Sequence, residues 1–410
     1  MLKRKNYWLL FAVLLLSLTS LSPSMELDTK GGTYPPRQPP DQSERPPSGE
    51  AGEIESLSVR VSLSSSDFSV LEQISKNYSL STGVSVELKN TGTEDEAAQV
   101  RQELTVGASP DIVMLDGHSI YDLASRGYLL PVDIYQSSPG STPLAMLIPQ
   151  MQWNGYNWGV PLDIDPYVLV YSPQRLAGLG LPEAPGSLEQ WNTLLARLKN
   201  EPQKDTYLLA LDTRNSYGAA AMLQSMGSGL HSAGLAQAQW IEAARSKFYL
   251  TSRHNEKIWE LLQEGKLAVA AVPLSEWKAH GDSTLAVQVP GKQEGKAGYE
   301  MIDSRFLALP AQAGNPEAAV RWLAYVTSRS AQLEWLKNTD RLPALDELYR
   351  SELPELDQLP VPAGWFLADE NAPRAGTEGR WNAKAEAALG LITGKLDAAG
   401  YEAAVNASSE

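Results

Sequence analysis

The sequence predicts an α/β protein made of two lobes, and three observations lead to this fold class. Short apolar runs with the pattern of β-strands alternate with longer segments whose apolar residues have helical spacing. The run at 110–115 is apolar after its first two residues, which is typical of a parallel strand buried on both faces. The 410 residues also have the length of two domains. Alternating strands and helices favour sheets with right-handed crossover connections.

The first part of the folded chain is expected to contain three strands separated by two helices. Residues 57–63 alternate apolar and polar side chains, as a half-buried strand does. Four apolar side chains between residues 68 and 78 have the spacing of one helix face. The expected elements are a strand at 57–63, a helix at 68–78, a strand at 84–88, a helix at 94–104 and a strand at 110–115.

The same pattern recurs in the second part of the chain. A long helix is expected over 316–337, because Pro316 suits a first helical position and apolar residues recur on one side. A last helix is expected over 381–399. The other expected elements are strands at 167–171, 207–211, 267–272 and 305–309, and helices at 188–198, 219–226 and 257–263.

The N-terminus has the pattern of an export signal. Three basic residues at positions 3–5 precede an apolar run, Tyr7–Leu18. This run is shorter than the roughly 20 residues that span a bilayer. Residues 1–24 are therefore expected to be a signal peptide, or an N-terminal anchor if they are retained. Residues 25–55 hold six prolines among Gly, Ser and charged residues, which predicts a disordered linker.

The composition excludes several classes of function. The formal charge of −15 argues against binding to nucleic acid or to anionic membranes. The absence of cysteine excludes disulfides, thiolate metal sites, a cysteine nucleophile and a lipid anchor on an N-terminal cysteine. Motifs for a phosphate loop, a zinc protease or a serine hydrolase are missing. Neither a metal nor a cofactor is expected, since none of the histidines pairs with another at ligand spacing: His118, His231, His254 and His280.

Two acidic residues near the middle of the chain raise the question of catalysis. Asp163 and Asp165 suggest the carboxylate pair of a glycosidase. Alternate positions on a strand share a face, however, so an acidic protein contains such pairs by chance. The sequence favours this second interpretation, and no catalytic residue is expected.

The aromatic residues are unusual in type and in placement. The chain has 11 Trp and 16 Tyr but only 5 Phe, and many of the Trp and Tyr residues follow strands or lie in turns. An aromatic ring with a polar edge suits a half-exposed surface, where it can stack on the apolar face of a sugar. A single tryptophan can equally fill a core, but the set as a whole favours a polar ligand with apolar faces.

Five segments in order resemble the extracellular solute-binding proteins of bacterial ABC importers, of the maltose- and oligosaccharide-binding type. Pro110–His118 with Leu123–Asp133 resembles the family's "P-D-hydrophobic" strand and its later "G-x-L-x-P-L/V-D" turn. Tyr156–Pro161 with Val168–Tyr171 is similar to its "Y-G-V-P … L-x-Y-N" crossover. The other matching segments are Pro185–Trp191, Glu264–Ala270 and Asn315–Ser328. These segments lie between residues 110 and 328, and the resemblance is taken to extend over the folded part, residues 57–400.

The resemblance implies a periplasmic-binding-protein-like fold, in which two α/β lobes enclose a central ligand cleft. The chain would cross the hinge three times, near residues 165, 300 and 343. Lobe 1 would then hold residues 56–165 plus 301–343, and lobe 2 would hold residues 166–300 plus 344–410. Closure of the two lobes would trap the ligand between them.

Matching positions imply the ligand-binding residues, which should come from strand ends in both lobes. The primary candidates are Asp116, Asp165, Tyr217, Trp277 and Trp381. The secondary candidates are Ser65, Gly117, His118, Trp158, Tyr167, Asn215, Trp240 and Trp365. The register of Trp277 departs from the family pattern, because the family's usual glycine and proline arrangement is missing around it.

The implied function is non-catalytic capture of a sugar or oligosaccharide and its delivery to the permease of an ABC transporter. The protein would be an exported monomer at the cell surface. Without a lipobox cysteine, any tether depends on the N-terminal segment. Two alternatives remain open, a ligand-sensing partner of a membrane receptor and a secreted glycosidase that uses Asp163 and Asp165.

Overall fold

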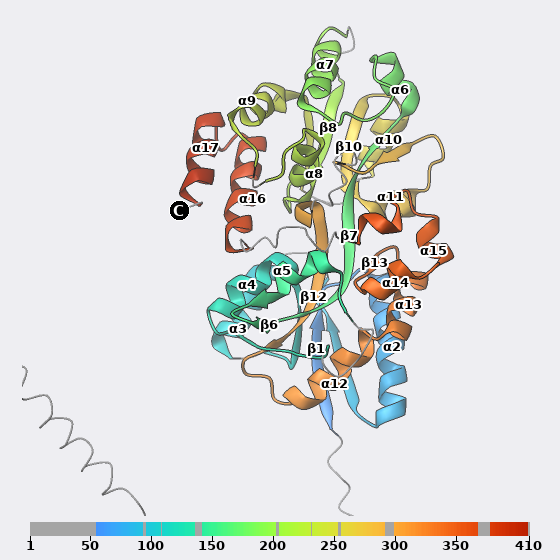
Figure 1. The fold of residues 1–410 in the computed structure, drawn as a ribbon, viewed down its shortest axis with the longest axis vertical. Helices are drawn as coiled ribbons and strands as arrows, with labels where there is room; N and C mark the ends of the chain where they lie inside the picture. Colours follow the sequence, from blue (N-terminus) through green and yellow to red (C-terminus); the bar gives the residue numbers. More distant parts are fainter. Residues whose placement is uncertain are drawn as a thin grey trace, which may run out of the picture. The chain divides into compact units, whose positions relative to one another are not determined.

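A computed structural model describes most of the chain, and residues from Glu53 onward form one compact unit (Figure 1). The signal peptide or anchor, most of the linker, His231 and His254 lie outside the described residues. The described ranges are 55–92, 96–107, 109–135, 142–201, 205–230, 232–252, 256–291, 299–367 and 378–408.

The predicted α/β fold class is confirmed, and its centre is a mixed sheet. Along the main path the strand order is β2–β1–β3–β12–β7–β10–β8–β9, with β4 on β12 and with β11 and β13 on β7. The strands of this path are β1 (Ser56–Val61), β2 (Ser85–Asn90), β3 (Ile112–Asp116), β7 (Val160–Tyr171), β8 (Tyr207–Asp212), β9 (Phe248–Thr251), β10 (Leu267–Pro273) and β12 (Ile302–Pro310). The short strands are β4 (Leu129–Leu130), β5 (Gln152–Trp153), β6 (Tyr156–Asn157), β11 (Ala286–Gln288) and β13 (Leu342–Pro343).

Two sets of parallel strands are joined by β12 and β7, which run antiparallel to their neighbours on the main path. β1 pairs in parallel with β2 and β3, and β8 pairs in parallel with β9 and β10. Between these sets, β12 is antiparallel to both β3 and β7, and β10 is antiparallel to β7. In Figure 1 the elements gather in an upper and a lower group, and β7 and β12 run between the groups. Strand β7 changes partner along its length. It pairs with β12 as far as Pro166 and with β10 from Tyr167 onward.

Helices cover the sheet, and their ends follow local capping chemistry. Ser64 caps the first helix by accepting a hydrogen bond from the Asp67 amide at 3.1 Å, and Gly83 ends it with φ of 79°. The helices are α2 (Ser65–Thr82), α3 (Glu96–Val106), α4 (Gly117–Ser125), α5 (Ile148–Met151), α6 (Pro173–Gly178), α7 (Leu188–Lys199), α8 (Tyr217–Ser225), α9 (Leu235–Ala244), α10 (Lys257–Gln263), α11 (Leu274–His280), α12 (Pro316–Val326), α13 (Arg329–Asn338), α14 (Asp346–Arg350), α15 (Pro354–Asp357), α16 (Glu378–Ile392) and α17 (Ala398–Ala407).

Two of the expected helices are wrong in their extent. The segment 316–337 forms two helices, because the Ser328 side chain caps α13 by accepting from the Ala331 amide at 3.4 Å. The segment 381–399 also divides, since Gly394 adopts a φ of 79° after α16. Asp397 then starts α17 by accepting from the Gly400 amide at 2.7 Å. In both cases a capping residue interrupts a run of apolar residues that continues in sequence.

A buried charge network lies where β7, β12 and β13 meet. Asp163 is fully buried and accepts hydrogen bonds from Nε of Arg305 at 3.0 Å, Nε of Arg341 at 2.8 Å and the indole of Trp335 at 3.0 Å. Burial alone would raise the pKa of Asp163, but the two guanidinium groups outweigh it and hold the pKa below its usual range. Arg341 also binds Asp303 at 3.0 Å. These contacts fix three strands to one another through side chains.

Asp165 belongs to the same network but has a different electrostatic balance. It is 1% exposed, and its carboxylate accepts from the Ser275 amide at 3.0 Å, the Ser275 hydroxyl at 2.5 Å and Arg341 at 3.2 Å. Burial raises the pKa of Asp165 to about 6, because Arg341 and Ser275 offset the desolvation only in part and Asp303 adds repulsion.

We expect Arg341→Met to lower the free energy of unfolding by about 3–5 kcal/mol, because it leaves buried carboxylates without their cation. Denaturant-induced unfolding followed by tryptophan fluorescence would measure the change. Arg329→Met is the matched control, since the ion pair of Arg329 with Glu347 is exposed at 44% and 45% and should contribute at most about 1 kcal/mol. Equal losses in the two variants would contradict a central role for Arg341.

The raised pKa of Asp165 predicts a specific dependence of stability on pH. The folded state favours the protonated form, so the stabilisation is complete below the usual pKa of 3.8 and is lost as the pH rises through about 6. As the pH rises from about 4 to about 6, the free energy of unfolding of Asp165→Asn should therefore increase relative to that of the parent protein. Urea unfolding at several pH values measures this slope.

Asp163→Asn provides the control for this slope. The pKa of Asp163 is lowered, so its contribution changes only below the usual pKa of 3.8. The stability difference between Asp163→Asn and the parent should stay constant between about pH 4 and pH 6. The assignment fails if Asp165→Asn shows the same flat difference.

Candidate ligand-binding site

Asp116 ends a strand and begins a helix, and this position fixes its side chain. One carboxylate oxygen caps α4 by accepting from the His118 amide at 2.8 Å. The other accepts from the hydroxyl of Tyr217 on α8 at 2.5 Å. The carboxyl group thus joins two helices that lie about 100 residues apart in sequence.

Asp116 is accessible to solvent, yet protein surrounds its carboxylate. Asp116 belongs to the exposed residues. Burial nevertheless raises the pKa of the Asp116 carboxyl, with repulsion from Asp303 in the same direction and with His118 and the Tyr217 hydroxyl opposing it. The carboxylate of Asp116 is thus reachable from the solvent although protein groups surround it.

Four rings form a continuous cluster beside Asp116, which we call the aromatic cluster: Tyr167, Tyr217, His118 and Trp381. His118 and Trp381 stack with centroids 3.6 Å apart and planes at 2°. Tyr217 lies 5.5 Å from Trp381, 5.7 Å from Tyr167 and 5.9 Å from His118. The rings come from β7, α8, α4 and α16, so the cluster joins elements from distant parts of the chain.

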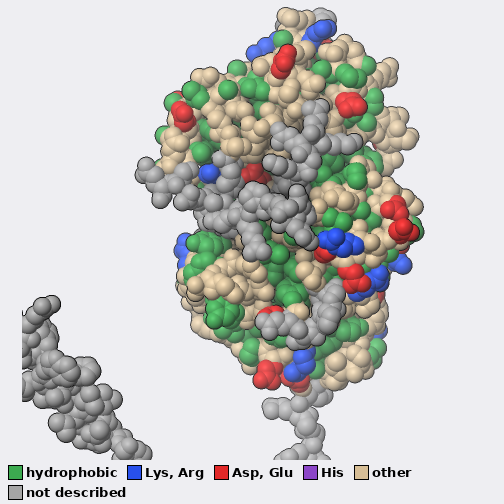
Figure 2. Space-filling view, viewed as in Figure 1, with side chains coloured by type: hydrophobic (Ala, Val, Ile, Leu, Met, Phe, Trp, Pro, Cys, Tyr) green, Lys and Arg blue, Asp and Glu red, His purple; other side chains and the backbone are tan. Residues whose placement is uncertain are grey.

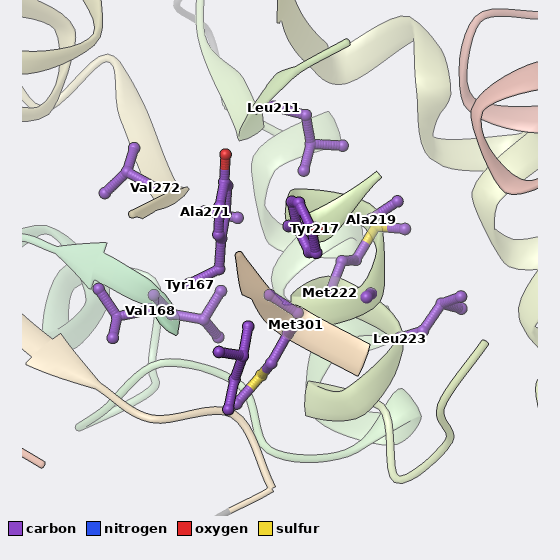
Figure 3. Close-up of a cluster of buried hydrophobic side chains, with 14 of the residues drawn as sticks. Tyr167, Val168, Leu211, Tyr217, Ala219, Met222, Leu223, Ala271, Val272 and Met301 are labelled. Atoms are coloured by element: carbon purple, nitrogen blue, oxygen red, sulfur yellow. The ribbon is translucent and has the colours of Figure 1, made fainter. Parts of the chain in front are cut away.

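Polar contacts hold the rings of the aromatic cluster in place. The amide of Asn215 donates to the hydroxyl of Tyr167 at 2.9 Å, and the amide of Asn382 donates to the His118 carbonyl at 3.1 Å. Figure 3 shows the rings of Tyr167 and Tyr217 close to each other among apolar side chains such as Met301. The rings are therefore buried on their apolar sides. The two tyrosine hydroxyls are hydrogen-bonded, whereas the indole nitrogen of Trp381 is buried with no hydrogen-bond partner in the described part of the chain.

Gly117 is required next to Asp116 by close packing. A β-carbon at Gly117 would lie 2.8 Å from the ring of Phe306, which is closer than real contacts allow. This absence of a side chain lets the first turn of α4 approach β12. Gly117 therefore positions the site rather than offering a group to a ligand.

The structure brings six of the predicted residues together, joins a seventh to them by a hydrogen bond and connects an eighth through the charge network. The six are Asp116, Gly117, His118, Tyr217 and Trp381, with Tyr167 reached through Tyr217. Asn215 joins them through the Tyr167 hydroxyl. Arg341 binds both Asp165 and Asp303 and so links these two residues. Beyond the effect of burial, Asp303 in turn raises the pKa of Asp116. Trp277 is half-buried on α11, the helix whose Ser275 binds Asp165.

Four other predicted residues have different surroundings. Trp240 is 5% exposed and packs in the core against Trp191 and Phe248, with centroids 5.6 and 6.2 Å away. Trp158 belongs with the β5–β6 hairpin, because its indole donates to the Trp153 carbonyl at 2.8 Å. The two remaining residues are Ser65, exposed at the start of α2, and Trp365, which meets the edge of Phe366.

Sequence reasoning missed the charged residues that surround the site. Asp303 lies directly opposite Asp165 in the pairing of β7 with β12, and Arg305 lies opposite Asp163. Arg341 comes from a third segment of the chain. The alternation of residues 302–306 could have indicated that Asp303 and Arg305 share a face of a strand. It could not have identified their partners, because strand register is a property of the folded sheet.

Within the described ranges, no group of His, Asp or Glu side chains could hold a metal ion. Nor does the described part of the chain contain a helix long and apolar enough to cross a membrane.

Comparisons with known structures agree with this architecture. The GacH receptor of Streptomyces glaucescens, solved without ligand and with acarbose, has a TM-score of 0.64 at 16% identity. The match covers 87% of this chain and 98% of that chain. A solute-binding protein of an ABC transporter from Thermotoga lettingae, with bound α-D-tagatose, has a TM-score of 0.63 at 16% identity and covers 86% and 97%. At these identities the likeness concerns the fold.

Sequence comparison identifies the family. No curated protein matches the chain. The profile of the family described as bacterial extracellular solute-binding proteins matches residues 73–360, well over half of the sequence. The resemblance found in the sequence motifs is thereby confirmed, and the chain belongs to the bacterial extracellular solute-binding proteins.

Proposed function

We propose that this protein captures a sugar or oligosaccharide between two lobes and delivers it to the permease of an ABC transporter. The observation that carries the proposal is the convergence of Asp116 with the aromatic cluster. Carboxylate oxygens accept hydrogen bonds from hydroxyl groups, and the faces of Trp and Tyr can stack on apolar sugar faces. The four rings of the cluster are only 1–6% exposed here, so in this proposal their faces become available to a sugar when the lobes move apart. This combination suits a ligand that is polar at its edges and apolar on its faces.

The ligands of structural relatives support a sugar. The GacH receptor was solved with acarbose, and the Thermotoga lettingae protein with α-D-tagatose. A solute-binding protein from Staphylococcus aureus, with a TM-score of 0.55 at 18% identity and coverage of 87% and 96%, was solved with maltose. These three proteins share the fold of this chain and were solved with sugars or a sugar analogue, which supports a saccharide as the proposed ligand.

The proposed lobes are residues 56–165 plus 301–343 and residues 166–300 plus 344–410. Strand β7 changes partner between Pro166 and Tyr167, close to the first proposed hinge crossing. Strand β12 begins at Ile302 and β13 covers Leu342–Pro343, near the other two. In this division Asp116 and His118 belong to lobe 1, and Tyr217 and Trp381 belong to lobe 2. Contacts between these pairs would then change when the lobes move.

The surroundings of Asp163 and Asp165 favour binding over glycoside hydrolysis. A glycosidase needs both carboxyl groups open to its substrate. Here Asp163 and Asp165 are 0% and 1% exposed, and each binds Arg341. We therefore assign the pair to the architecture of the protein and propose no catalytic residue.

The proposed location is outside the cytoplasmic membrane, in keeping with an extracellular family. The basic residues and apolar run at the N-terminus would direct export. If this segment is retained, it would tether the domain near its permease through the proline-rich residues 25–55. If it is removed, the protein would be free.

Saccharide binding is testable with a panel of neutral oligosaccharides that includes maltotetraose. A sugar that binds the folded state should raise the unfolding temperature, by an amount equivalent to about 2.7 kcal/mol at a hundredfold excess over Kd. For the best sugar, Trp381→Ala should weaken binding at least about tenfold by calorimetry, because it removes a ring of the aromatic cluster.

Trp153→Ala is the matched control for this experiment. Trp153 is half-buried in the β5–β6 hairpin, 5.6 Å from Trp158, and is not a member of the aromatic cluster. Its removal should leave the affinity unchanged. The proposal is wrong if no saccharide shifts the unfolding temperature, and the site is misplaced if both variants bind as the parent does.

A further inference from the structure

The proposed binding site contains more acidic than basic side chains. Burial raises the pKa of the Tyr167 hydroxyl, and repulsion from Asp303, Asp212 and Glu276 raises it further. Asp303 likewise adds to the rise that burial causes in the pKa of Asp116. On the face shown in Figure 2, by contrast, side chains of both signs are scattered among neutral ones. The chain as a whole is acidic, with a formal charge of −15, and the site shares this excess of carboxylates.

The arginines near the site already form ion pairs with acidic side chains. Arg341 binds three carboxylates, those of Asp163, Asp165 and Asp303. Nε of Arg214 donates to Asp212 at 2.7 Å. Arg305 binds Asp163 and lies 3.2 Å from Asp67. These three cations thus face more carboxylates than they can neutralise.

Among the described residues, Asp116 has no ion pair with a lysine or arginine. Each of its oxygens accepts one hydrogen bond, from the His118 amide or the Tyr217 hydroxyl. An ionised carboxylate offers about four acceptor positions, so roughly two remain for a ligand. Because Asp116 is exposed, those positions can be reached from the solvent.

Gln150 occupies Nε2 of the His118 ring. The Gln150 carbonyl oxygen accepts from Ser304 at 2.6 Å, which directs the Gln150 amide nitrogen towards Nε2 of His118 at 3.3 Å. An amide nitrogen is a donor, so Nε2 of His118 accepts in this arrangement and does not donate to Asp116.

We propose that the saccharide captured at this site carries a protonated amino group, which pairs with Asp116 beside the aromatic cluster. The inference rests on the proposed saccharide-binding function and adds the chemical class of the ligand. An ammonium group supplies several N–H donors and a positive charge, and Trp and Tyr rings attract cations. A neutral hydroxyl would fill an acceptor position and leave the excess charge. An anionic sugar would add to it.

Calorimetry with matched oligosaccharides tests the inference. The probes are tetramers of glucosamine and galactosamine, each beside its N-acetylated form, together with tetragalacturonate and maltotetraose. Slightly below neutral pH and at low salt, the better amino tetramer should bind at least about tenfold more tightly than its N-acetylated form, a difference of about 1.4 kcal/mol. Tetragalacturonate should not bind, and added salt should reduce the preference.

Two variants assign the preference to Asp116. Asp116→Asn keeps a helix cap and an acceptor for Tyr217 while removing the charge, so it should bind the amino and N-acetylated forms with affinities within about threefold. Asp122→Asn is the control, because it removes the same charge from α4 at a surface pair with Arg126. It should keep the preference of the parent protein.

The outcomes separate this inference from the function on which it rests. If a neutral tetramer binds as tightly as the amino form, or if Asp116→Asn keeps the preference, the inference is overturned and saccharide binding stands. If neither the amino tetramers nor any neutral sugar binds, the proposed function fails and the inference fails with it.

Discussion

The fold depends on the buried carboxylate of Asp163. Two guanidinium groups and an indole converge on it from β12, α13 and the segment before β13. A buried charge is tolerated only when it is paired and hydrogen-bonded, so these segments can adopt few other arrangements. Strand β7 carries both Asp163 and Tyr167, and the network therefore also determines where the aromatic cluster can form. The same interaction holds the architecture and sets the electrostatics of the site.

The sequence predicted the order of the elements because strand and helix periodicity are local properties. It extended two helices too far, although Ser328 and Gly394 were visible as stop signals, because the apolar runs on either side continue. It also predicted only the second part of β7, since Asp163 and Asp165 interrupt an apolar strand unless their arginine partners are known. Ion pairs between distant segments depend on packing, which the pattern of one segment does not contain.

The ligand-binding residues were likewise predicted only in part. Motif position alone selected Asp116, Tyr217 and Trp381, which the structure brings together. The same reasoning also selected Trp240, whose ring packs in a core, because burial of a tryptophan cannot be judged from its place in a motif. The acidic residues that act on Tyr167 come from three different elements, β12, β8 and α11, so no single segment of the sequence indicates that they lie together.

The order in which the site is assembled has a consequence for secretion. The aromatic cluster takes rings from positions between 118 and 381, so in a chain exported unfolded it would form only after almost the whole domain had crossed the membrane. Contacts of such long sequence separation also form late and slowly during folding. Such a chain would therefore be unable to bind the proposed solute until these last contacts had formed.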